Sequence, residues 1–181
     1  MSSAYMDYTD WKERERAADR LNARELGQLM LWAMWKGVPA AAKDELDHFE
    51  IVYPHIEAVV YTPNRHTPSV RLRDGKAKGS LVTVSSRKVT LLTNRPGDLS
   101  GVRAAVDLTD GRKKELFDTM RNGYAVESGG EKYRRIQAIL FRLDPESGGI
   151  VVTLELVRAE DCGICEQPQE LVGLTGRYWN R

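Results

Sequence analysis

Two alternating runs of apolar and polar residues in the C-terminal half constrain the fold of this chain most strongly. Residues 135–144 and 150–158 have the period-two pattern of half-buried strands, and the Pro-Glu-Ser-Gly-Gly segment between them is typical of a turn. Two such runs with a short connection predict a long β-hairpin, which requires an antiparallel sheet. The expected core residues of the hairpin are Ile139, Phe141, Leu143, Ile150, Val152, Leu154 and Leu156.

Residues 62–97 contain three shorter alternating runs, which predict a small antiparallel meander. The runs cover residues 69–74, 80–85 and 88–93. Because successive side chains of a strand point to opposite faces, Arg71 and Arg73 should lie on one face of the first strand. Val70 and Leu72 should then point to the core.

The same segment carries most of the excess positive charge of the chain. It has eight basic residues and one acid, whereas the net charge is −4 over residues 1–61, +2 over 98–143 and −4 over 144–181. Such asymmetry indicates a polyanionic partner, either nucleic acid or an acidic protein surface. The basic residues are Arg65, Arg71, Arg73, Lys76, Lys78, Arg87, Lys88 and Arg95.

The first 50 residues carry helix signals. Asn22 and Glu25 have the spacing of a capping box, so a helix should begin at Ala23. Gly37 followed by Pro39 should end it. Two further helices are expected over residues 9–21 and 39–48.

The helix after Asn22 has a second apolar stripe, formed by Leu31, Met34 and Trp35, roughly opposite its first. A helix that is apolar all round is buried on both sides. The stripe is therefore either packed within the chain's own domain or part of an interface in a homo-oligomer, where Trp and Met are enriched.

The remaining elements complete an α+β prediction. Strands are expected over residues 56–61 and 102–108, and a helix with Leu116, Phe117 and Met120 on its apolar face is expected over residues 110–122. We therefore predict one domain over residues 1–181 with a mainly antiparallel β-sheet and one intervening helix. Its parts are a helical N-terminal segment (1–50), the sheet (56–160) and a C-terminal tail (161–181).

The start of the helix over residues 110–122 is a second basic feature. Arg112, Lys113 and Lys114 occupy its first turn, where cations oppose the helix dipole. Free backbone N–H groups together with three cations would form a phosphate or carboxylate site. Alternatively, Asp110 and Glu115 simply pair with these cations in water.

Cys162 and Cys165 form a C-x-x-C pair, for which three interpretations remain open: a structural turn, part of a zinc site, or a redox pair. A zinc site would need ligands from a second copy or from distant histidines. Asp161 and Glu166 flank the pair and argue against a reactive thiol, because neighbouring negative charge raises a thiol pKa. Zinc is the one cofactor that the sequence suggests.

Several functional classes find no support in the sequence. Nucleophile-elbow, metalloprotease, phosphate-loop and dinucleotide-binding motifs are all missing. The longest apolar run, residues 29–35, is too short to cross a bilayer. With two cysteines and no basic segment leading into an apolar one, a reducing, cytoplasmic compartment is expected.

We therefore expect a non-enzymatic binding protein whose cationic β-face contacts nucleic-acid phosphates. The alternative is an assembly protein that docks on an acidic protein surface, either as a homo-oligomer or within a larger complex, such as one of viral or mobile-element origin. The residues expected to bind phosphates are Arg71, Arg73, Lys76, Lys78, Arg87, Lys88, Arg95, Arg112, Lys113 and Lys114.

Overall fold

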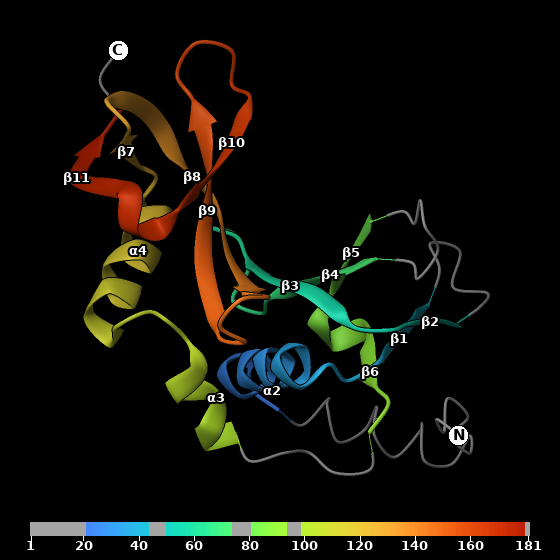
Figure 1. The fold of residues 1–181 in the computed structure, drawn as a ribbon. Helices are drawn as coiled ribbons and strands as arrows, with labels where there is room; N and C mark the ends of the chain where they lie inside the picture. Colours follow the sequence, from blue (N-terminus) through green and yellow to red (C-terminus); the bar gives the residue numbers. More distant parts are fainter. Residues whose placement is uncertain (1–20, 44–49, 74–80, 94–98, 180–181) are drawn as a thin grey trace. The chain divides into compact units, whose positions relative to one another are not determined.

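The computed structural model describes residues 21–43, 50–73, 81–93 and 99–179, and it has the predicted α+β fold, with an N-terminal helix followed by mainly antiparallel strands (Figure 1). The chain divides into two compact units. Unit 1 comprises Met1–Val59 and Thr67–Ala105, and unit 2 comprises Val60–His66 and Val106–Arg181. Of the helix expected over residues 9–21, all but Leu21 lies outside the described residues, as do Lys76, Lys78 and Arg95. The expectation of one domain remains a prediction.

Helix α2 (Ala23–Lys36) of unit 1 begins and ends where the sequence predicts. The Asn22 side chain accepts a hydrogen bond from the Glu25 backbone N–H (2.8 Å), and the Glu25 carboxylate accepts one from the Asn22 N–H (3.2 Å). Gly37 ends the helix in the left-handed region, with φ of 69°. This position favours glycine because a Cβ is strained there.

Removing the capping box should destabilise the protein modestly. Asn22→Ala leaves one helix-terminal N–H without its acceptor, so we expect the free energy of unfolding to fall by about 1 kcal/mol. Chemical denaturation should show this as a lower midpoint with an unchanged m-value. Asn22→Asp, which keeps the acceptor, should retain most of the stability, and equal losses in both variants would contradict the capping role.

A three-stranded antiparallel sheet of unit 1 corrects the helix expected over residues 39–48 in its described part, because Ala40–Lys43 form a strand; residues 44–48 lie outside the described residues. Strand β1 (Ala40–Lys43) lies between β2 (Glu50–Tyr53) and β6 (Val89–Leu91). Its three alanines are at most 2% exposed, so small side chains fill a strand that is covered on both faces. Tertiary pairing here overrides the helix preference of alanine.

The third strand of the expected meander also belongs elsewhere. β3 (Ile56–Tyr61), β4 (Ser69–Arg73) and β5 (Leu81–Ser85) are neighbours in that order, but β6 pairs with β1. The cause is Ser86, which is buried at the start of the 3₁₀ turn η1 (Ser86–Lys88). Its N–H and Oγ both donate to the Pro68 carbonyl (3.1 and 2.6 Å), which fixes this turn and directs the chain out of the meander.

The strand expected over residues 102–108 is wrong for most of its length. Residues Leu99–Ala105 form helix α3, which packs beside α2 in unit 1. Only the start of unit 2 is extended here: Val106 forms a parallel bridge with Ile150, and the Asp107 N–H donates to the Ile150 carbonyl (2.8 Å).

Unit 2 is built around the predicted hairpin and helix. β8 (Glu131–Leu143) and β9 (Ile150–Arg158) pair antiparallel, and α4 (Asp110–Asn122) contacts β8 (Figure 1). Three strands of this unit are not predicted by the sequence. They are β7 (Tyr124–Ser128), which pairs with β8, β10 (Ile164–Pro168), which pairs with β9, and β11 (Val172–Tyr178), which pairs with β7. A 3₁₀ turn, η2 (Gln169–Leu171), joins β10 to β11.

The core of unit 2 follows the predicted pattern with one exception. Leu143 is 41% exposed, because it ends β8 at the hairpin turn. Tyr61 packs its ring edgewise against Phe117 and Phe141, with centroids 5.1 and 5.6 Å apart, and burial raises its pKa to about 12. The other predicted hairpin and helix residues are buried: Ile139, Phe141, Ile150, Val152, Leu154, Leu156, Leu116, Phe117 and Met120.

Candidate nucleic-acid interface

Strand β4 presents its cations as the alternation predicts. Val70 and Leu72 are fully buried, whereas Arg71 is half-buried and Arg73 is exposed. The pairing register places Arg71 opposite Thr83 of β5, and the apolar residues opposite one another. Unit 1 therefore holds two guanidinium groups on the side of β4 that faces away from its core.

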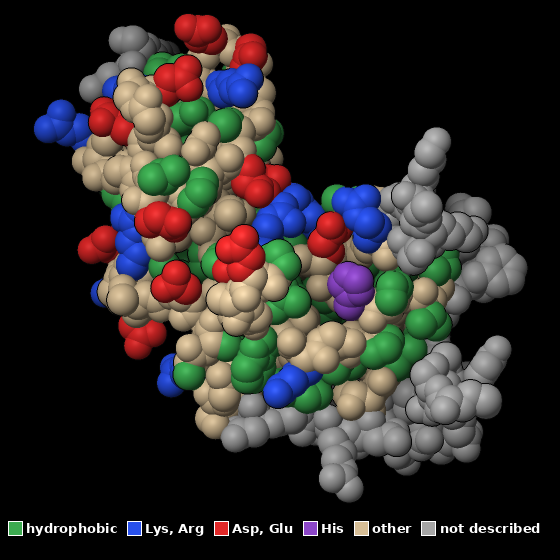
Figure 2. Space-filling view, in the orientation of Figure 1, with side chains coloured by type: hydrophobic (Ala, Val, Ile, Leu, Met, Phe, Trp, Pro, Cys, Tyr) green, Lys and Arg blue, Asp and Glu red, His purple; other side chains and the backbone are tan. Residues whose placement is uncertain are grey.

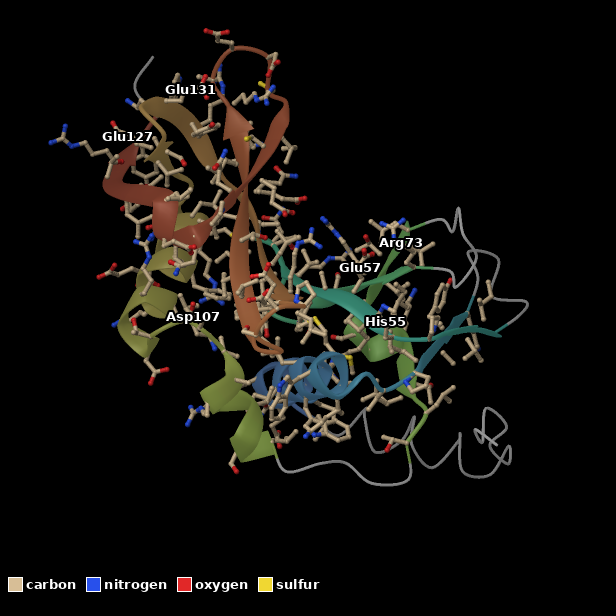
Figure 3. The ribbon with its side chains drawn as sticks, viewed as in Figure 1. His55, Glu57, Arg73, Asp107, Glu127 and Glu131 are labelled. Carbon is tan, nitrogen blue, oxygen red and sulfur yellow. The ribbon has the colours of Figure 1, made fainter. Side chains whose placement is uncertain are left out.

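Arg73 forms an ion pair on this surface. Its Nε lies 3.2 Å from Oε2 and 3.3 Å from Oε1 of Glu57 in the neighbouring strand β3 (Figure 3). The Arg73 side chain is still 49% exposed. Exposed ion pairs of this kind contribute little to stability, so a phosphate can replace the carboxylate at low cost.

Two further cations follow β5 in the turn η1. Arg87 and Lys88 are exposed, and the Arg87 N–H donates to the Ser85 hydroxyl (3.4 Å). Since Ser85 pairs with Ser69, this turn lies beyond the first residue of β4. We call Arg71, Arg73, Arg87 and Lys88 the β4–η1 cations.

Arg112 has a different environment from the β4–η1 cations. Its Nε donates to the Gln169 Oε1 (2.9 Å), and its Nη2 donates to the carbonyls of Gln169 (2.6 Å) and Val172 (2.7 Å). The side chain thus ties the start of α4 to η2 and β11, at 57 and 60 residues' distance in sequence. Lys113 and Lys114 beside it are exposed.

A cavity of about 390 Å³ lies at the start of α4. Two carboxylates line it, Asp107 (labelled in Figure 3) and Glu170, while the guanidinium of Arg112 already donates to three protein acceptors. The two carboxylates repel an anion, and the guanidinium is already occupied, so this cavity disfavours the binding of an anion. The lining residues are Asp107, Leu108, Thr109, Arg112, Gln169, Glu170 and Val172.

The residues expected at a subunit interface lie mostly inside the chain. Leu31 is 6% and Met34 is 1% exposed, which leaves them little surface for a partner. Trp35 is half-buried, with Lys36 Nζ 4.3 Å from its ring centroid and a Cβ added at Gly101 only 3.5 Å from its ring. These contacts are explained by packing of the second apolar stripe of α2 within the chain itself. A homo-oligomer that uses this stripe remains a prediction.

Cys162 lies in the turn before β10, and Cys165 lies within that strand. Cys162 is exposed with φ of 58°, and Cys165 is half-buried. Within the described residues, no group of three or more histidine, cysteine or acidic side chains converges to hold a metal ion. Zinc binding therefore remains a prediction, and it would need ligands from elsewhere.

An aromatic and basic cluster in unit 2 is not predicted by the sequence. Lys132 Nζ and Arg134 Cζ lie 5.0 and 5.1 Å from the centroid of Trp179, and Tyr178, 64% exposed, meets Tyr124 edgewise at 4.8 Å. The spacing of Lys132 and Arg134 alone does not predict a cluster. Their contact with Trp179 depends on the position of β8 in the folded chain. Acidic and basic side chains are interspersed on the face of unit 2 seen in Figure 2.

The comparisons with known proteins do not assign the chain to a family. No protein-family model matches the sequence, and no curated protein matches it either. In the described part of the chain, none of the helices has the length and apolar character needed to cross a membrane.

Proposed function

We propose that this chain is a non-enzymatic binding protein that contacts nucleic-acid phosphates through the β4–η1 cations. The observation that supports the proposal is the alternation of burial along β4, which turns Arg71 and Arg73 away from the core of unit 1. Arg87 and Lys88, both exposed, extend the positive charge along the chain. Guanidinium groups bind phosphate oxygens through paired, charge-assisted hydrogen bonds, as they also bind carboxylates.

The proposed mode of binding is independent of base sequence. Contacts to phosphates position a protein on nucleic acid but carry no sequence information. The described residues of β4, β5 and η1 include no aromatic side chain that would stack on bases. Affinity should therefore be electrostatic and should vary little between unrelated duplexes.

A second candidate is docking on an acidic protein surface. Leu81 pairs directly with Arg73 and is 43% exposed, and Ile51 and Val52 of unit 1 are 41% and 45% exposed. An exposed apolar side chain beside an arginine, as Leu81 is beside Arg73, is typical of protein interfaces. Glu57 already supplies a carboxylate to Arg73, the kind of contact that such a partner would make.

Fluorescence anisotropy at low salt distinguishes the two candidates. The probes are labelled duplex DNA, single-stranded DNA, RNA and poly-glutamate. We expect binding to the nucleic acids, and we expect Arg71→Gln to weaken duplex binding about eightfold near 0.1 M salt, the effect of one lost phosphate contact.

Arg103→Gln is the matched control, because it removes the same charge from an exposed position of α3 in the same unit. It should leave the affinity nearly unchanged. Binding to poly-glutamate alone would favour the acidic protein partner, and equal losses in the two variants would contradict a site on β4.

A further inference from the structure

The strand register of unit 2 gathers several polar side chains around Cys165. Cys165 pairs with Leu156 of β9, and Arg158 lies two residues further along that strand. Tyr133 of β8 pairs with Arg158, and Gln167 lies two residues after Cys165. Paired residues share a face, and so do residues two apart in a strand, so the thiol, guanidinium, phenol and carboxamide lie on one face of the sheet.

The contacts within this group favour the thiolate. Gln167 Nε2 lies 3.2 Å from the sulfur of Cys165, and the register places the positively charged Arg158 on the same face of the neighbouring strand. The hydrogen bonds from Gln167, Tyr133 and Arg158 lower the pKa of the Cys165 thiol, although its partial burial acts in the opposite direction. A positive charge and N–H donors at the sulfur are what lower a thiol pKa in proteins.

Tyr133 lies farther from the sulfur of Cys165 than Gln167 does. Its hydroxyl has a single hydrogen, and the carboxylate of Glu131 (labelled in Figure 3) lies 2.9 Å away, whereas the sulfur lies at 3.9 Å. The hydrogen bond to Glu131 raises the Tyr133 pKa to about 12. The phenol hydrogen is therefore held mainly by Glu131, and the hydrogen bond from Tyr133 to the sulfur is the weaker of the two.

The flanking carboxylates do not act on the sulfur as the sequence suggests. Glu166 points to the opposite face of β10, where its carboxylate accepts a hydrogen bond from Arg142 Nη2 (2.6 Å). Asp161 accepts from the Gly163 N–H (2.8 Å), and its other oxygen lies 4.0 Å from Arg158 Nη1. Both carboxylates are thus occupied by donors, so the sequence-based objection to a reactive thiol does not hold for Cys165.

We infer that Cys165 is a modification site: a thiol that exchanges with low-molecular-weight disulfides. Its proton leaves to water, and the thiolate lone pair attacks one sulfur of the small disulfide. A bond forms between the two sulfurs as the original S–S bond breaks, and the second sulfur leaves as a thiolate with the electron pair. The products are a mixed disulfide on Cys165 and one free small thiol, and this chemistry is independent of nucleic-acid binding.

Exchange with 4,4′-dithiodipyridine tests the inference, because this neutral disulfide releases an absorbing thione. The Cys162→Ser chain retains Cys165, and the Cys165→Ser chain retains the exposed Cys162. We expect Cys165 to react several-fold faster at pH 7, with a rate that rises with pH through a lower midpoint. A lower pKa enlarges the thiolate fraction more than it reduces nucleophilicity.

Substitutions of Arg158 in the Cys162→Ser chain give a second test, in which the rate of Cys165 exchange is measured against pH. Arg158→Gln should slow the reaction at pH 7 at least about twofold and move the midpoint to higher pH, and Arg158→Lys should restore part of the rate. Arg135→Gln is the matched control, since Arg135 pairs with Val157 on the opposite face. Equal or faster reaction of Cys162, no effect of Arg158→Gln, or stoichiometric zinc that shields both thiols would overturn the inference.

Discussion

Arg112→Ala should lower the free energy of unfolding by about 3 kcal/mol. The substitution removes three hydrogen bonds that the charged guanidinium donates. The backbone carbonyls of Gln169 and Val172 then lose this donor. Hydrogen bonds to charged groups contribute about 1.5–3 kcal/mol, and unsatisfied carbonyls add a further cost. In a chain of this size, the melting temperature should fall by roughly 6–12 °C.

Lys114→Ala is the matched control for this prediction. Lys114 is an exposed cation two residues further along α4, so its loss should change stability by less than about 0.5 kcal/mol. Arg112→Lys should give an intermediate loss, because an ammonium cannot reproduce the planar fork of the guanidinium. A stable Arg112→Ala variant with weakened binding to nucleic acid would instead restore Arg112 to the phosphate-binding residues.

The elements governed by local chemistry could be predicted from the sequence. The capping box at Asn22 sets the start of α2, Thr109 and Gly123 delimit α4, and alternation in β4 separates Arg71 from Val70. Each of these signals acts over a few residues. The sequence therefore shows them without any knowledge of tertiary partners.

The elements that depend on distant partners could not be predicted. The alanines of β1 favour a helix locally and become a strand only because β2 and β6 pair with them. β6 leaves the meander because the buried Ser86 binds the Pro68 carbonyl, 18 residues away in sequence. The partners of Arg112 lie 57 and 60 residues away in sequence, and Tyr133 and Arg158 approach Cys165 from other strands, so these contacts could not be predicted without the tertiary structure of unit 2.

Raising the salt concentration from 50 to 200 mM should weaken duplex binding roughly 500-fold. About five phosphate contacts release five counterions, and log K then changes by roughly −0.9 per contact for each tenfold rise in salt. The contacts are expected from three of the β4–η1 cations, Arg71, Arg73 and Arg87, together with Lys76 and Lys78, which lie outside the described residues. Anisotropy titrations of one duplex at four salt concentrations measure this effect.

The slope of log K against log salt for a double variant tests the phosphate-binding claim most directly. We expect a slope near −4.5 for the unmodified chain and about −2.7 for Arg71→Gln/Arg87→Gln, because two contacts are lost. Arg103→Gln should keep the slope of the unmodified chain. An unchanged slope in the double variant, or a flat signal at the lowest salt for every nucleic acid tested, would contradict phosphate binding by the β4–η1 cations.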